Sequence, residues 1–180
     1  MKIQVIYYSL TGCTKRLAEG IYEGLEEKDK SIHDFKDGIP ALDGDILLIG
    51  YWGVSGGPDE KFTEFLKGIK GKTIGMFCTL GYYADSAHAF DTIQKGLSYV
   101  KEDNEIIGSY VANGAVAKSL KKGQNKEEGA VPTEQKELRW KMTDNHPTEA
   151  EIVLGAERFN ERIALYKSCR EYGIPFQSVK

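Results

Sequence analysis

Short hydrophobic stretches alternate with longer amphipathic ones along the first two-thirds of the chain. Stretches rich in β-branched, aromatic or aliphatic residues predict five strands, at 3–8, 32–35, 45–50, 72–78 and 106–112. The third and fourth stretches are hydrophobic at almost every position, which is typical of strands covered on both faces of a sheet. After the first stretch, apolar residues recur at the spacing of one helix face: Leu17, Ala18, Ile21 and Leu25.

Further helices follow the third and fourth predicted strands. Apolar residues recur at helical spacing in 62–69 and again in 87–100. A strand, a helix and a second strand at this spacing form a right-handed unit whose two strands are parallel. The sequence therefore predicts a doubly wound α/β domain with a five-stranded parallel sheet and helices on both faces.

From residue 113 to about 147 the sequence is polar, has few apolar residues and lacks the alternation of strands and helices. Such a long excursion within a compact domain is usually a functional loop or an insertion. Within it, Trp140 is interpreted as part of a small local core, and the alternative is a lid over a bound ligand. Helical spacing returns in a closing helix at about 148–167, and we expect one domain over residues 1–180.

Composition and charge narrow the function classes. Hydrophobic residues make up 41% of the chain and charged residues 28%, as in globular proteins. The formal net charge of -3 argues against a nucleic-acid binder, which needs a basic face. No apolar stretch approaches the length of a membrane-spanning helix, and the first residues lack the apolar run of a secretory signal. Three cysteines without metal-like spacing fit a reducing cytoplasm, where we expect this protein.

Ligands of open parallel sheets bind beyond the carboxyl ends of the strands, and three segments fall there: 9–14, 51–57 and 79–83. The first segment places three hydroxyls around Gly12, directly before a predicted helix. A helix N-terminus offers unpaired N–H groups to an anion, so this segment predicts a phosphate site, and helix capping is the alternative. The GxxxxGK[ST] and GxGxxG motifs are absent from the chain.

Two of these segments resemble the flavodoxin family. Ser9-x-Thr11-Gly12-x-Thr14 is similar to the family's phosphate-binding loop, and Tyr51-Trp52-Gly53 is similar to its Thr-Trp-Gly turn. The resemblance implies a flavodoxin-like three-layer α/β/α sandwich with strand order 2-1-3-4-5. It also implies a non-covalently bound FMN that shuttles electrons. It covers residues 1–112 and the closing helix but does not extend across 113–147.

The resemblance also implies which residues bind FMN. The phosphate would lie on the first loop, Trp52 would stack on one face of the flavin ring, and Tyr82 or Tyr83 would stack on the other. The Gly53–Val54 peptide would turn its carbonyl toward N5 of the flavin. The expected set is Ser9, Leu10, Thr11, Gly12, Cys13, Thr14, Tyr51, Trp52, Gly53, Val54, Thr79, Leu80, Gly81, Tyr82 and Tyr83.

Other chemistries fit less well. A phosphatase-type nucleophile at Cys13 would need an arginine six residues later, where Glu19 stands. Trp52 could instead be a packing residue at the rim of the core. Three dispersed histidines form no metal set. A response-regulator receiver would need aspartates at the ends of the first and third strands, where Tyr8 and Tyr51 stand.

The resemblance implies an electron-transfer flavoprotein that supplies electrons to a partner reductase. We expect a carrier more than a stand-alone enzyme. The alternatives are an FMN-dependent NAD(P)H:quinone-type oxidoreductase, for which 113–147 could supply a substrate pocket, and an accessory module without a redox cofactor. The expected partners are donor and acceptor redox proteins, with no nucleic acid and no membrane, and the chain would be a monomer or weak dimer.

Overall fold

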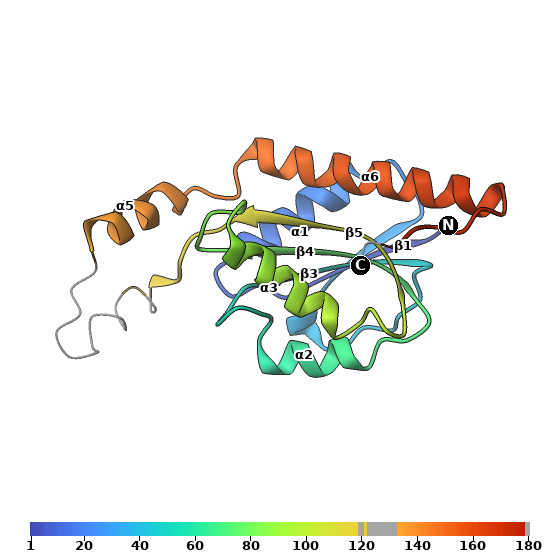
Figure 1. Ribbon diagram of the computed structural model, residues 1–180, viewed down its shortest axis with the longest axis horizontal. Helices are drawn as coiled ribbons and strands as arrows, with labels where there is room; N and C mark the ends of the chain where they lie inside the picture. Colours follow the sequence, from blue (N-terminus) through green and yellow to red (C-terminus); the bar gives the residue numbers. More distant parts are fainter. Residues whose placement is uncertain (119–120, 122–132, 179–180) are drawn as a thin grey trace.

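In the computed structural model, whose described residues are 1–118, 121 and 133–178, five parallel strands form one sheet (Figure 1). The strand order β2-β1-β3-β4-β5 confirms the order implied by the resemblance. The strands are β1 (Ile3–Tyr7), β2 (Lys30–Asp34), β3 (Ile46–Trp52), β4 (Thr73–Leu80) and β5 (Glu105–Asn113). Among the described residues, no helix is long and apolar enough to cross a membrane.

Helices cover both faces of the sheet, as the sequence predicts. On one face lie α1 (Cys13–Gly24) and α6 (Glu149–Glu171), and on the other lie α2 (Glu60–Lys67) and α3 (Ala87–Ser98) (Figure 1). A further helix, α5 (Glu134–Thr143), lies beyond the carboxyl ends of the strands (Figure 1). This is the edge at which ligands bind in open α/β sheets.

Two hydrophobic clusters, one on each face of the sheet, form the core. Leu17 and Phe159 belong to the cluster under α1 and α6, and Phe62 and Leu97 belong to the cluster under α2 and α3. Every residue of β4 is buried, and so is β3 up to Tyr51, which confirms the prediction from their continuous hydrophobic sequences. The sheet is therefore a rigid platform for the loops that leave its carboxyl edge.

Most element boundaries differ from the sequence prediction by one to four residues. The second strand starts at Lys30, and Phe35 lies beyond it in a short 3-10 helix (η1, Phe35–Asp37). The closing helix extends to Glu171, and the tail after it packs on the helix and the sheet. The ring of Tyr166 lies 5.5 Å from that of Phe176, and the Ile106 N–H donates to the Ser178 hydroxyl at 2.7 Å. These contacts hold the tail against the sheet.

The fully buried Phe159 provides a test of this packing. Its ring lies 6.1 Å from that of Phe77, so Phe159→Ala would leave a cavity between α6 and the sheet. We expect the free energy of unfolding to fall by about 3–5 kcal/mol in chemical denaturation. The control Leu165→Ala, at a 48% exposed position of the same helix, should cost less than about 0.5 kcal/mol. Equal losses in the two variants would contradict the packing described here.

Candidate functional site

The carboxyl ends of the central strands bring the predicted loops together. In the sheet register, Trp52 pairs with Thr79, and Thr79 pairs with Ala112. A cavity of about 190 Å³ opens at this edge. Its lining comes from all three predicted loops and from the segment after β5: Leu10, Thr11, Trp52, Gly53, Thr79, Leu80, Gly81, Tyr82, His88, Gly114, Ala115, Val116, Ala117, Lys136, Arg139 and Trp140.

The first loop leaves the N-terminus of α1 open. Gly12 occupies the N-cap with φ 95°, a left-handed conformation that favours glycine, and a Cβ placed there would have no neighbour within 4 Å. No side chain caps α1, and its first turn has no acidic residue, whereas side chains cap α2, α3, α5 and α6. An uncapped N-terminus with open space before it can bind an anion such as a phosphate.

The three hydroxyls of this loop do not cap α1, so the capping alternative is not what the structure shows. The buried Ser9 hydroxyl accepts the Gly12 N–H at 3.1 Å and holds the turn. The Thr14 and Thr79 hydroxyls lie 2.8 Å apart in a buried hydrogen bond that joins the first and third loops. The exposed Thr11 hydroxyl lies 3.3 Å from the sulfur of Cys13. Buried hydrogen bonds of Ser9 and Thr14 thus fix the first loop, while its Thr11 side remains exposed.

The second loop carries an aromatic wall of the cavity. Trp52 is half-buried, lines the cavity, and its ring lies 4.6 Å from that of Tyr8 at an interplanar angle of 61°. The Gly53 N–H donates to the Thr79 carbonyl at 2.8 Å. A tight turn follows, in which Ser55 and Gly56 both have positive φ. Trp52 is therefore held at the rim of the core with one side toward the cavity.

Tyr51, also in the expected set, lies elsewhere. Its side chain is fully buried, and its hydroxyl donates to the Thr92 carbonyl at 2.8 Å. Burial raises the pKa of this hydroxyl well above its ordinary value. The structure thus places the Tyr51 side chain in the core beneath α3, and Val54 is not among the cavity-lining residues.

The two tyrosines of the third loop differ in their position relative to the cavity. Tyr82 lines the cavity, and its ring lies 5.5 Å from that of His88. Tyr83 is 41% exposed and is not among the described residues that line the cavity. The sequence leaves this choice open because adjacent residues of a loop can point either way. The structure favours Tyr82 as the ligand-facing residue.

The segment after β5 covers the cavity, which the sequence analysis offered only as an alternative. Gly114 donates its N–H to the Leu80 carbonyl at 2.8 Å, and Ala115 donates to the Cys13 sulfur at 3.3 Å. Val116 packs so closely on Gly81 that a Cβ at Gly81 would lie 2.1 Å from a Val116 methyl carbon. Trp140 of α5 is buried and lines the cavity, which favours the lid interpretation over the local core. In the polar sequence of this segment, Trp140 was the residue that indicated a covering role.

The chain matches the family model for flavodoxin domains over residues 4–160. It belongs to the flavodoxin family. The flavodoxin-like domain-containing protein BilS of Clostridioides difficile (strain CD3) is 35% identical over 160 residues, which cover 84% of this chain and 90% of the relative. The BilS protein of Clostridium symbiosum (strain WAL-14163) is 28% identical over 137 residues, covering 67% and 72% of the two chains.

Solved flavodoxins share the fold. A flavodoxin from the domain Archaea aligns with a TM-score of 0.57 at 15% identity and covers 93% of this chain and 99% of that one. A Fusobacterium nucleatum flavodoxin bound to flavin mononucleotide aligns with a TM-score of 0.54 at 18% identity and covers 93% and 97%. At these identities the alignments show the fold of this flavodoxin-family member and do not assign its residues.

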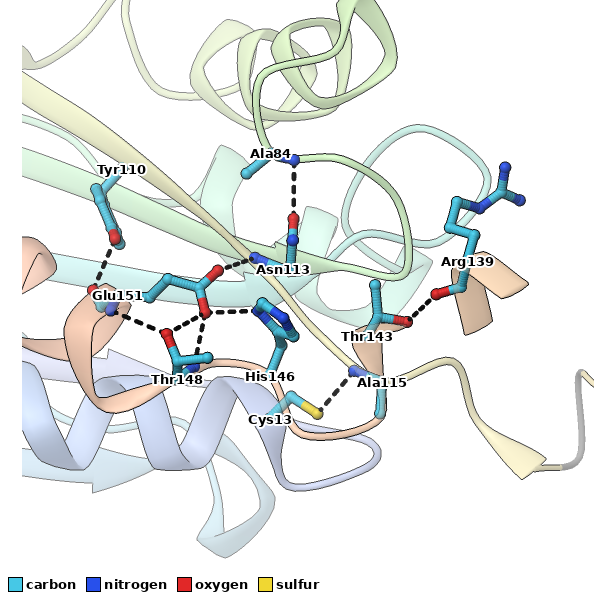
Figure 2. A network of polar contacts seen from close by, with 10 residues as sticks. All are labelled: Cys13, Ala84, Tyr110, Asn113, Ala115, Arg139, Thr143, His146, Thr148 and Glu151. Carbon is cyan, nitrogen blue, oxygen red and sulfur yellow. Dashed lines mark hydrogen bonds and ion pairs between the residues drawn. The ribbon is translucent and has the colours of Figure 1, made fainter. Parts of the chain in front are cut away.

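In this flavodoxin domain, one carboxylate fixes the start of the covering segment (Figure 2). Glu151 accepts the Asn113 N–H at 3.1 Å, where β5 ends, and the Thr148 N–H at 2.6 Å, where α6 begins. Its second oxygen also lies 2.6 Å from Nδ1 of His146. Asn113 in turn accepts the Ala84 N–H at 2.8 Å, which connects this network to the third loop.

The same network shifts the titration of its groups. Burial tends to raise the pKa of Glu151, but the hydrogen bonds from Thr148, Asn113 and His146 outweigh burial and lower it. Burial, together with the nearby Glu151 charge, raises the pKa of Tyr110 to about 12. Glu151 is therefore ionised near neutral pH, and its charge stabilises the folded state.

Replacing Glu151 with Gln tests this network. Because the folded-state pKa of Glu151 is lowered, its stabilising charge is fully present above its ordinary value of 4.5 and is lost as pH falls through the folded pKa. We expect E151Q to lower the free energy of unfolding by about 1–3 kcal/mol at pH 7, and the difference from the wild type to shrink at pH 3. Denaturation at both pH values measures this.

The control is E149Q, because Glu149 is exposed in the same first turn of α6. It should change stability by less than about 0.5 kcal/mol at either pH. A loss in E151Q that stays constant between pH 7 and pH 3 would contradict the role of the Glu151 charge.

Proposed function

We propose that this chain is an FMN-binding electron carrier that supplies electrons to a partner reductase. The observation that supports the proposal is one cavity lined by Thr11, Trp52 and Tyr82, in which Thr11 directly precedes the uncapped N-terminus of α1. A phosphate site beside two aromatic rings fits a flat, phosphorylated ring system better than it fits a sugar phosphate or a metal ion. As a member of the flavodoxin family, the chain has FMN as its cofactor.

The residues divide the binding of FMN between them. We propose that the N–H groups at the start of α1 bind the phosphate, and that Thr11 adds a hydroxyl from the exposed side of the loop. Trp52 and Tyr82, on the second and third loops, flank the ring. Burial of aromatic area and offset stacking give this contact its affinity. We propose that the Gly53 carbonyl faces the ring edge, because the N–H and the carbonyl of Val54 are both bonded to Gly57.

Bound FMN supplies one- and two-electron transfer, and the protein supplies binding, orientation and electrostatics. The Gly53 N–H is already used by the Thr79 carbonyl, so its donor is not free for the ring. The hydrogen bond between Thr14 and Thr79 keeps the first and third loops in a fixed relation. The loops therefore present a preorganised site that exchanges electrons without a large rearrangement.

Exposed apolar residues beside the cavity support docking of a redox partner. Leu10 lines the cavity and is 53% exposed, and Leu138 and Met142 of α5 are each 59% exposed. Apolar surface next to a cofactor site is typical of protein contacts. We propose donor and acceptor redox proteins as partners and a monomer or weak dimer as the oligomeric state. Cys13, Cys78 and Cys169 are free thiols, which fits our expectation of a cytoplasmic location.

A second candidate function is an FMN-dependent NAD(P)H:quinone-type oxidoreductase. The covering segment favours it, because Lys136, Arg139 and Trp140 extend the cavity beyond the three loops. Such an extension could bind a second substrate above the ring. We favour the electron carrier, since Lys136, Arg139 and Trp140 could equally contact the bound FMN.

Substitution of Trp52 tests the cofactor role. Trp52→Ala should weaken FMN binding by about 1–3 kcal/mol, because stacking of bases on aromatic side chains contributes that much in other proteins. Trp52→Phe should retain most of the affinity. Quenching of FMN fluorescence measures the dissociation constant, and circular dichroism checks the fold. A Trp52→Ala variant that unfolds, or that binds FMN like the wild type, would contradict the assignment.

Oxidation of NADH or NADPH separates the two candidate functions. We expect the FMN-loaded protein alone to turn over far more slowly than the about 1–10³ s⁻¹ typical of enzymes. Absorbance of the reduced nicotinamide, followed with and without a quinone, measures this rate. Steady turnover in the enzymatic range would favour the oxidoreductase and count against the carrier.

A further inference from the structure

Arg139 places a positive charge at the cavity that no carboxylate of the described residues neutralises. It lies on α5, lines the cavity, and its guanidinium carbon lies 4.3 Å from the centre of the Tyr82 ring. Its Nε is buried and has no hydrogen-bond partner among the residues that the structure describes. Within the same described part of the chain, the guanidinium makes no ion pair. A buried donor of this kind lacks the bond that burial normally requires.

Among the described residues that line the cavity, the charged side chains are all basic. Lys136 is the second basic residue of the lining, and no aspartate or glutamate is among the described lining residues. The nearby carboxylate of Asp144 pairs with Lys121 at 2.6 Å. A group that enters this cavity therefore meets a positive field, which is stronger there than in bulk water because the surroundings are partly buried.

The packing of α5 holds this charge in place. Stacking of a guanidinium on an aromatic ring is favourable and orients its plane. Trp140, the next residue, is only 8% exposed, and the ammonium of Lys136 lies 5.4 Å from its ring centre. The carbonyl of Arg139 accepts the Thr143 hydroxyl at 3.2 Å (Figure 2). Arg139 thus bridges α5 and the third loop with a defined orientation.

We propose that Arg139 stabilises the reduced, anionic form of FMN and so raises the reduction potential of the bound flavin. This inference rests on the proposed binding of FMN in the cavity. Two electrons and one proton convert FMN to FMNH⁻, so reduction adds one negative charge to the ring. A fixed cation favours the charged product over the neutral oxidised ring, and only such a difference changes the potential. Because Arg139 lies on α5 and not on the first, second or third loop, this is a feature of the segment after β5.

The test compares R139Q with R139K in the FMN-loaded protein. Dithionite titration against a reference dye without oxygen gives the midpoint potential, and fluorescence quenching gives the dissociation constant of oxidised FMN. In R139Q we expect the affinity for reduced FMN to fall at least tenfold relative to that for oxidised FMN, about 30 mV for a two-electron couple. R139K keeps the charge and should restore most of the difference. K141Q removes a charge from an exposed position of the same helix and should leave the potential unchanged.

Three results would overturn the inference. In the first, R139Q binds FMN with the wild-type potential. In the second, R139Q and R139K both lose oxidised and reduced FMN to the same extent, as a merely structural role predicts. In both of these the wild type still binds FMN, so the proposed function stands. In the third, the wild type does not bind FMN, and the proposed function fails together with the inference.

Discussion

The parallel pairing of β1, β3 and β4 is the constraint on which the candidate site depends. In a parallel sheet all carboxyl ends point to one edge, and the register decides which residues end side by side. Here Tyr7 pairs with Gly50, and Trp52 pairs with Thr79, so the three loops start within one patch of the edge. The first and third loops then lie side by side, and the buried hydrogen bond between the Thr14 and Thr79 hydroxyls joins them. The site follows from the register before any ligand is bound.

The network around Glu151 extends this arrangement to the last strand. By bonding to the end of β5 and to the start of α6, Glu151 sets where the chain leaves the sheet and where it returns. The residues from Gly114 to Ala117 then cross the third loop, and α5 brings Trp140 and Arg139 to the cavity. A segment of sequence that is polar and without periodicity thus becomes part of the site. This segment contributes positive charge and a covering layer to the site, and it adds little to the hydrophobic core.

The sequence predicted the strands and the three loops because each has a strong local signal, and the resemblance to the flavodoxin family implied the strand order. Continuous apolar stretches identify the strands around Leu48 and Met76, and the spacing of hydroxyls around Gly12 identifies the first loop. It did not predict the helix at Glu134–Thr143, and it gave its place at the cavity only as an alternative. Few apolar residues mark a buried face there, and its position depends on contacts with Tyr82. It also could not show that Tyr51 points into the core while Trp52 points to the cavity. Successive side chains of a strand point to opposite faces of the sheet, so the exact position at which the strand ends decides which of the two residues faces the ligand.

We propose that the three loops and the covering segment form one FMN site. The most direct measurement titrates the purified protein with FMN and, in parallel, with riboflavin, which lacks the phosphate, and follows the flavin fluorescence and absorption. The account predicts strong quenching and shifted absorption bands with FMN, and much weaker binding of riboflavin because the uncapped start of α1 has no phosphate to bind. Equal binding of the two flavins would contradict the phosphate site, and no quenching by either would contradict the FMN site as a whole.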